Sequence, residues 1–168
     1  MRRYSPALEM RRLLHEIKRQ MYRGDRPGAL ARFLNAVAAR QYAAGVLARS
    51  RDVTLEVRGR RSGRTIRVPV VIADLAGERY LVSMLGERAN WVHNVRRARG
   101  QATLRHRGGD EPVHLVEVPP EHRAPILRRY LAVAPGARPH LPVGRNASLP
   151  EFASIADGFP VFRIDAAG

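Results

Sequence analysis

The sequence predicts an α+β protein in which about six short, mostly antiparallel strands form a small β-barrel with N-terminal helices and flanking helices. Apolar residues recur with helical spacing over the first fifty residues, and from Asp52 onward they alternate with polar residues, which is the period of a strand. Turn sequences separate several short apolar runs, which favours a barrel over a parallel sheet. At 168 residues, without an internal repeat or linker, the chain is expected to be one domain.

Residues 1–50 are predicted to form a helical segment. A break at residues 23–28 (RGDRPG) separates a first helix from a second, which runs from about residue 29 to 48. The first helix has an apolar face made of Met10, Leu13, Leu14, Ile17 and Met21. Its opposite face is basic, so the segment is expected to pack on the barrel or to lie at a membrane surface. Residues 51–168 form the predicted barrel domain.

The barrel strands follow from two-residue periodicity. Residues 53–58 alternate apolar and polar side chains, and the GRRSG turn at residues 59–63 connects them to a returning strand over residues 66–73. Pro69 lies inside that strand, which implies an edge position, a bulge or a bend, because proline donates no hydrogen bond to the ladder. Further strands are expected over residues 79–84, 102–107, 113–118 and 161–164.

Two flanking helices are expected between these strands. A short helix is predicted over residues 90–98, and Pro119-Pro120 opens a second helix. The second helix carries the apolar residues Ile126, Leu127, Tyr130 and Leu131. A stretch rich in Pro and Gly follows over residues 134–150 and leads towards the last strand.

The charge indicates an anionic partner. Thirty basic residues and fifteen acidic ones give a net charge of +15, which favours nucleic acid, a membrane surface or a polyanionic cofactor. No apolar run reaches the roughly 18 to 20 residues that span a bilayer, and no signal peptide is recognisable, so a cytoplasmic location is expected, with membrane association through the N-terminal basic helix left open. Cysteine is absent and the histidines lack metal-ligand spacing, so no metal site is expected.

Two motifs on the first hairpin are candidates for binding an anion. In the GRRSG turn, glycines at both ends permit an anion-binding backbone nest, while Arg60 and Arg61 offer charge-assisted bonds and Ser62 a hydroxyl. Arg67, two residues before a proline bend, is placed to point towards the same pocket. The alternatives are a solvated basic turn and a surface arginine beside a structural proline.

A third candidate is the stretch SMLGERANWVHN at residues 83–94. A loop with Gly86 meets a helix start, where free N–H groups favour negative charge. Trp91, the one tryptophan, and Asn94 share a helical face. The alternative is a core tryptophan beside a structural asparagine.

The order of these motifs resembles the deazaflavin (coenzyme F-420)-dependent nitroreductase family. A strand, GRRSG, a strand with Arg67-Val68-Pro69, and then S-x-x-G before W-x-x-N follow one another over roughly residues 53–104. The resemblance implies a split β-barrel and an F-420H2-dependent reductase that transfers a hydride to a small hydrophobic electrophile, which is a quinone, an enone or a nitro compound. Coenzyme F-420 carries a phosphodiester and a polyglutamate tail, which an arginine-rich mouth suits. FMN is the less favoured alternative cofactor.

The resemblance also assigns cofactor contacts, although it assigns no catalytic residue. Contacts to the phosphate and tail are Arg60, Arg61 and Ser62. The strand along the cofactor comprises Ile66, Arg67, Val68, Pro69, Val70 and Val71. The segments beside the deazaflavin and its phosphate are Ser83, Met84, Leu85 and Gly86, followed by Asn90, Trp91 and Asn94.

Two departures from the family pattern concern the loop and the substrate pocket. Better-known members have a glycine pair where this chain has Gly86-Glu87, and they line the pocket with tyrosines where residues 134–140 contain none. Tyr130 lies one turn earlier.

Among other functions, a nucleic-acid-binding module is disfavoured because aromatic residues are only 6% of the chain and no helix-turn-helix is present. An FMN-dependent reductase of the same fold stays open, as do a monomer and a homodimer.

Overall fold

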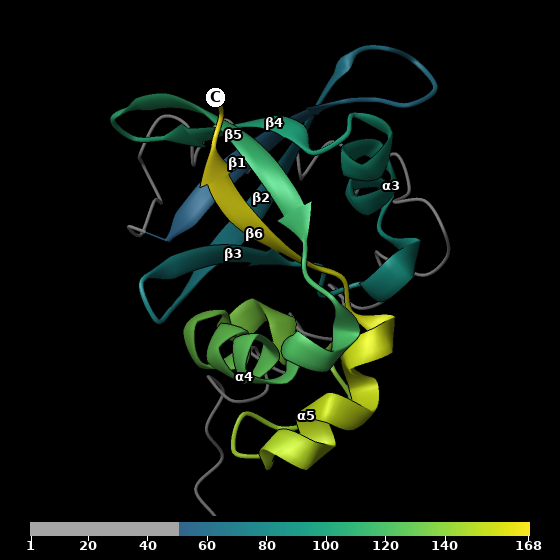
Figure 1. Cartoon of the computed structure of the whole chain (residues 1–168), viewed down its shortest axis with the longest axis vertical. Coiled ribbons are helices and arrows are strands. Elements are labelled where there is room, and N and C mark those ends of the chain that lie inside the picture. Colours follow the sequence, from purple (N-terminus) through teal and green to yellow (C-terminus); the bar gives the residue numbers. More distant parts are fainter. Residues whose placement is uncertain (1–50) are drawn as a thin grey trace, which may run out of the picture.

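A computed structural model describes residues 51–168, and the predicted helical segment 1–50 lies outside the described residues. The strands are β1 (Asp52–Arg58), β2 (Thr65–Leu75), β3 (Glu78–Val82), β4 (Gln101–His106), β5 (Gly109–Glu117) and β6 (Val161–Ala166). They close an antiparallel barrel in the order β1-β2-β3-β6-β5-β4, with β4 returning to β1 (Figure 1). The predicted barrel of about six mostly antiparallel strands is therefore confirmed.

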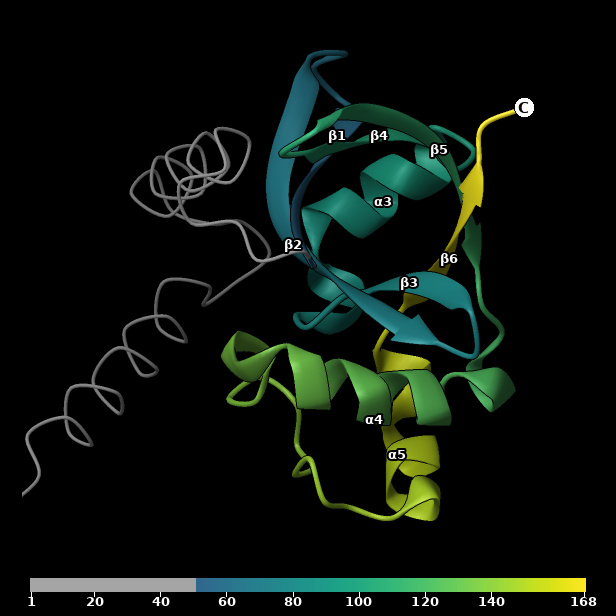
Figure 2. The same cartoon turned by 90° about the vertical axis from the view of Figure 1, so that its left-hand side faces the viewer.

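The helices lie at one end and on one flank of this barrel (Figures 1 and 2). The α-helices are α3 (Asn90–Arg97), α4 (Ala124–Val133) and α5 (Leu149–Ile155). The short 3-10 helices are η1 (Gly86–Arg88), η2 (Pro120–His122), η3 (Pro135–Ala137) and η4 (Ala156–Gly158).

Strand β2 has one described neighbour over most of its length. It pairs with β1 from Thr65 to Val71, but with β3 only from Ile72 to Leu75. Pro69 lies opposite Thr54 on the stretch where no other described strand pairs with the second edge of β2. Proline is tolerated there because its missing N–H breaks no second ladder. Of the edge position, bulge or bend that the sequence allowed for Pro69, the structure shows the edge position.

Two hydrophobic cores hold the fold together. The barrel interior is filled by side chains such as Val53, Leu55, Leu81, Leu104, Val113 and Phe162. Helix α3 covers the end of the barrel next to the β1–β2 turn and buries Trp91, Val92 and Val95 in this core. The rings of Trp91 and Phe162 lie 5.5 Å apart at 55°, a tilted aromatic contact that fixes α3 against β6.

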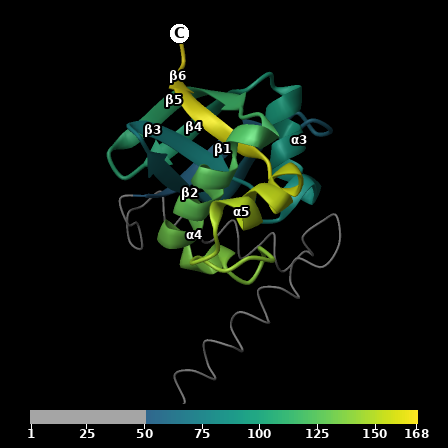
Figure 3. The same ribbon diagram turned by 60° about the horizontal axis from the view of Figure 1, so that its bottom comes forward.

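The second core lies outside the barrel, between the strands and helices α4 and α5. Both helices lie on the same side of the barrel (Figure 3), and α4 packs mainly on β2. Its buried face carries Ile126, Leu127, Tyr130 and Leu131, the residues expected to face inward. Tyr130 is only 4% exposed, and burial raises the pKa of its phenol.

One helix boundary differs from the sequence prediction, and one helix is additional. The Pro119-Pro120 pair opens η2, and α4 begins only at Ala124, where Pro125 occupies its first turn. Helix α5 was not predicted. It begins with a capping box in which the backbone N–H of Ser148 donates to Glu151 at 2.8 Å. The S-x-x-E signal was present in the sequence, inside a stretch whose Pro and Gly content suggested irregular structure.

Candidate functional site

The GRRSG turn closes on itself through backbone bonds. The N–H of Gly59 donates to the carbonyl of Arg64 at 2.8 Å, and that of Gly63 donates to Gly59 at 2.9 Å. Gly63 has φ +66°, a conformation that side chains with a Cβ rarely adopt. The Ser62 hydroxyl accepts from the N–H of Arg64 at 3.3 Å, so it contributes to the turn itself. The turn is therefore an ordered hairpin that presents its arginines outward.

Arg60 fastens this turn to α3. Its backbone N–H and its Nη1 both donate to Oδ1 of Asn94 at 3.1 Å. The guanidinium also bonds to Asn90, from Nη2 to Oδ1 at 3.1 Å and from Nη1 to the carbonyl at 3.4 Å. Asn94 is only 4% exposed, so these bonds satisfy a buried amide oxygen. Two motifs that are separate in the sequence thus meet in the fold.

The free positive charge of the turn lies on three other arginines. Arg58, Arg61 and Arg64 are exposed, and none of them forms an ion pair with a carboxylate of residues 51–168. Unpaired guanidinium groups around one turn favour the approach of an anion such as phosphate or carboxylate. Arg58 and Arg64 were not among the predicted site residues, although they flank the two glycines of the turn in the sequence.

The first half of β2 presents two different faces. Ile66, Val68 and Val70 lie opposite apolar residues of β1, and Val68 and Val70 pack against the barrel core. Ile66 is 36% exposed, which makes it one of two large apolar side chains exposed among residues 51–168. Arg67 lies on the other face, where its Nε donates to Glu56 at 2.5 Å. It forms a cross-strand ion pair there and does not point towards the face of Ile66.

The loop from Ser83 to Gly86 is also closed by its own bonds. The buried Ser83 hydroxyl donates to the carbonyl of Gly86 at 2.8 Å, and the N–H of Gly86 donates back to Ser83 at 3.1 Å. Gly86 has φ +68°, and a Cβ there would lie 2.6 Å from the carbonyl oxygen of Gly158. Met84 packs against the outer core and Leu85 against the barrel core. The loop therefore lies where the two cores meet.

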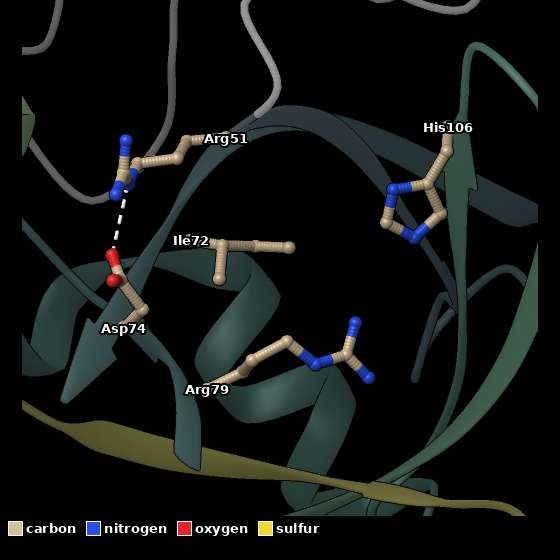
Figure 4. A pocket seen from close by; sticks show the side chains of 5 residues that line it. All are labelled: Arg51, Ile72, Asp74, Arg79 and His106. Carbon is tan, nitrogen blue, oxygen red and sulfur yellow. Dashed lines mark hydrogen bonds and ion pairs between the residues drawn. The ribbon is translucent and has the colours of Figure 1, made fainter. Parts of the chain in front are cut away.

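The opposite end of the barrel carries a cluster that the sequence did not predict. A cavity of about 250 Å³ is lined by Arg51, Ile72, Asp74, Arg79 and His106 (Figure 4). Arg51 pairs with Asp74, and Arg79 makes a bidentate pair with Glu111, which also bonds to His106. Hydrogen bonds from Arg51 and Arg129 hold the pKa of Asp74 below its usual range. Barrel closure brings these residues together, and no local sequence pattern signals it.

Apart from Pro69, on the free edge of β2, and Ser83 and Gly86, which bond to each other in their loop, the predicted site residues fall into three groups. The first group consists of residues that the fold brings into contact. Arg60, Asn90 and Asn94 meet through hydrogen bonds, while Val68, Val70, Leu85 and Trp91 meet in the barrel core. The exposed ones are Arg61, Ser62 and Ile66. The third group points away from the turn and α3. Arg67 pairs with Glu56, and Val71 and Met84 pack against the outer core.

Two further observations concern the described residues. Within residues 51–168, no group of three or more His, Cys, Asp or Glu side chains is placed to hold a metal ion. None of the helices in this part of the chain is both long and apolar enough to cross a membrane.

Two solved structures show the same fold at TM-scores just above 0.5. One match is a chain solved as a domain-swapped dimer, at 15% identity and a TM-score of 0.51, covering 79% of this chain and 94% of that one. Another is a protein of unknown function from Agrobacterium tumefaciens, at 15% identity and a TM-score of 0.52, covering 79% of this chain and 55% of that one. A solved F-420-H2-dependent reductase matches at 19% identity with a TM-score of 0.46, covering 68% and 93%.

The sequence itself matches a family model. No curated protein matches the chain. The model of the F-420H2-dependent quinone reductases matches residues 32–143, which is about two thirds of the chain. The split-barrel fold agrees with that match. The chain therefore belongs to the F-420H2-dependent quinone reductase family, and it is an oxidoreductase with coenzyme F-420 as its cofactor.

Proposed function

We propose that this reductase transfers a hydride from reduced F-420 to a small hydrophobic electrophile, with quinones and enones preferred. The observation that carries the proposal is the ordered GRRSG turn, which presents Arg58, Arg61 and Arg64 without carboxylate partners among residues 51–168. The turn is fastened to α3 next to the free edge of β2. Membership of the family supports the same reading of the site.

The residues present suit the chemical groups of F-420. The phosphodiester and the polyglutamate tail are anionic, and the free guanidinium groups of the turn match them in charge and geometry. The deazaflavin is a flat ring system, and Ile66 offers exposed apolar surface on the unpaired stretch of β2. Cationic and apolar surface therefore lie on the same hairpin, as a cofactor with an anionic tail and an apolar ring requires.

The predicted site residues take two different roles in this proposal. The exposed residues Arg61, Ser62 and Ile66 make direct contacts with the bound cofactor. The buried residues Ser83, Trp91 and Asn94 hold the surrounding backbone, because their polar groups already bond within the protein or their rings fill the core. Arg60 joins the two parts, since its guanidinium bonds to α3 while its backbone belongs to the turn.

Reduced F-420 supplies the hydride when bound, and the protein orients it and excludes water. Orienting the cofactor requires a rigid binding surface. The GRRSG turn and the Ser83–Gly86 loop provide it, because each is held by hydrogen bonds within itself. Exclusion of water follows from the apolar side chains of Val68, Val70 and Leu85, which pack against the barrel core under that surface.

The acceptor preference rests on the segment after α4. Residues 134–140 contain no tyrosine, and Tyr130 is buried in the outer core. Hydroxyl groups that line the substrate pocket of better-known family members are therefore missing from this segment. We expect nitroimidazoles to be turned over more slowly than quinones or enones. Steady-state assays in which nitroimidazoles are the best substrates would contradict this preference.

A fluorescence titration of the full chain with F-420 and with FMN tests the cofactor part of the proposal. F-420 should bind clearly more tightly, because FMN lacks the polyanionic tail that the free arginines match. Equal or tighter binding of FMN would favour an FMN-dependent reductase of the same fold. Duplex DNA added as a competitor should leave F-420 binding unchanged at fixed ionic strength, whereas displacement would favour a nucleic-acid-binding role for the turn.

A further inference from the structure

Four charged side chains form a continuous series of ion pairs beside the Ser83–Gly86 loop. Glu87 accepts two bonds from Arg96, from Nη1 to Oε2 at 2.7 Å and from Nη2 to Oε1 at 2.9 Å. Arg96 also donates to Glu117, from Nε to Oε2 at 2.9 Å and from Nη2 to Oε1 at 2.6 Å. Glu117 then accepts from Nη2 of Arg123 at 3.2 Å. We call these four residues the ion-pair brace.

Arg123 brings the brace back to the loop. Its side chain is 5% exposed, and its Nη1 donates to the carbonyls of Ala156 and Phe159 at 3.1 and 3.4 Å. These carbonyls lie at the start of η4 and directly after it. The carbonyl oxygen of Gly158, inside η4, would lie 2.6 Å from a Cβ at Gly86. The contacts therefore run from Glu87 through α3, β5, Arg123 and η4, and η4 lies next to Gly86, the residue before Glu87.

The brace differs from an ordinary surface ion pair. Isolated exposed pairs contribute little, because water screens the charges and ordering the side chains costs entropy. Here the Glu87–Arg96 pair is bidentate, and one ordered arginine serves two carboxylates at once. Arg123 is buried, and backbone carbonyls satisfy its guanidinium. Hydrogen bonds from Arg96 lower the pKa of Glu87, so its carboxylate is charged at neutral pH.

We propose that the ion-pair brace positions the Ser83–Gly86 loop for binding of F-420, with Glu87 and Arg96 as positioning residues. The inference rests on the proposed function, in which this loop lies beside the deazaflavin. Glu87 stands where better-known family members have the second glycine of a pair. A glutamate there restricts the backbone more than glycine, and its side chain ties the loop to α3. The brace thus replaces a flexible residue with an anchored one.

The sign of the charge makes this inference testable. Glu87→Gln removes a negative charge near a site for a polyanion, so long-range electrostatics alone predicts tighter F-420 binding. Loss of the brace predicts the opposite, because the loop then has to be ordered at the cost of binding free energy. We expect the affinity for F-420 to fall about three- to tenfold in Glu87→Gln. Arg96→Lys should lower it similarly, because a lysine keeps the charge but cannot bridge two carboxylates.

Hydrogen exchange of the protein without cofactor provides an independent measurement. The amides of Gly86 and Ala89 donate to Ser83 and Gly86 and report on loop order. In Glu87→Gln, exchange should rise about threefold or more in the segment 83–90 and stay unchanged in β1 and β4. Glu121→Gln is the matched control, because it makes the same charge change on an exposed residue outside the brace.

The outcomes separate the brace from the proposed function. Faster exchange over residues 83–90 together with weaker F-420 binding in both brace variants supports the inference. Unchanged exchange, or unchanged or tighter binding of F-420 by Glu87→Gln, overturns it. If the wild-type chain does not bind F-420, the proposed function fails, while the exchange experiment still decides whether the brace orders the loop. General unfolding is recognised by raised exchange in β1 and β4, and Arg96→Lys then decides the question.

Discussion

The two ends of the barrel use arginine differently. At the α3 end, Arg58, Arg61 and Arg64 are exposed and have no ion pair with a carboxylate of residues 51–168. At the opposite end, Arg51 and Arg79 line a cavity (Figure 4). Arg51 is bonded to Asp74, and Arg79 to Glu111. Both ends are basic, but the two arginines that line the cavity are paired with carboxylates, whereas Arg58, Arg61 and Arg64 of the turn have no carboxylate partner among residues 51–168.

The comparison shows that net charge alone does not locate a site. Arg51 and Arg79 are already paired within the protein, so an anion that binds either of them would have to displace Asp74 or Glu111. At the α3 end the turn backbone is already ordered by its own hydrogen bonds and by Arg60, so binding of an anion there does not have to order the backbone.

The largest expected effect is that of Gly86→Ala. A Cβ at Gly86 would lie 2.6 Å from a backbone oxygen, at φ +68°, so both strain and a clash oppose the substitution. We expect a loss of about 2 to 4 kcal/mol in the free energy of unfolding. The matched control is Gly77→Ala in the β2–β3 turn at the cavity end, where φ is +83° and no atom lies within 4 Å of the added Cβ. Urea unfolding should show a loss of only about 1 kcal/mol for the control, and equal losses would contradict the role of the contact with Gly158.

The next effect concerns Arg60, for which Arg79 is the counterpart. Arg60→Ala removes three side-chain hydrogen bonds to α3 and leaves the buried Oδ1 of Asn94 with the backbone N–H of residue 60 alone. We expect the free energy of unfolding to fall by about 1 to 2 kcal/mol. Arg79→Ala breaks a pair whose side chains are 38% and 34% exposed, so its cost should stay below about 1 kcal/mol. A larger loss at Arg79 than at Arg60, measured by urea unfolding, would reverse this ranking.

Arg61 should affect binding and not folding. It is exposed and has no ion pair within residues 51–168, so Arg61→Ala should leave the melting temperature nearly unchanged. The affinity for F-420 should fall about tenfold, and its dependence on salt should weaken, because a charge-assisted bond is lost. Arg51→Ala is the control at the cavity end and should leave F-420 affinity unchanged. An Arg61 variant that binds F-420 like the wild type would show that this arginine has no role in the site.

The sequence predicted the fold better than the site. Alternating apolar residues and turn signals located every strand, and Pro69 limited its part of β2 to an edge position, a bulge or a bend, because these signals are local. The partner of an arginine is decided by tertiary structure. Arg60 and Arg61 are neighbours in one motif, yet one bonds to α3 and the other is exposed. No periodicity distinguishes them, so the sequence assigned both to the cofactor.

Three features escaped prediction for physical reasons. The brace joins Glu87 to Glu117 across thirty residues through one arginine, and the cavity cluster gathers residues from four strands. Both depend on how the barrel closes. Helix α5 did carry a local signal in its capping box, but the surrounding Pro and Gly content concealed it. Residues that only long-range contacts bring together are thus the part of the site that the sequence leaves open.

The smallest expected effect is a pH dependence at the cavity end. Hydrogen bonds from Arg79, with a smaller contribution from His106, lower the pKa of Glu111 below its ordinary value of 4.5. A carboxyl whose pKa is lower in the folded state stabilises the fold above its unfolded pKa, and this contribution is lost as the pH falls through the folded pKa. Thermal unfolding of the wild type should therefore lose more stability between about pH 5 and pH 3 than that of Glu111→Gln. Because both partners are about a third exposed, the difference should be less than about 1 kcal/mol. Identical pH profiles would show that the Arg79–Glu111 pair contributes nothing to folding, and the contrast between the two ends would then rest on the free arginines of the turn alone.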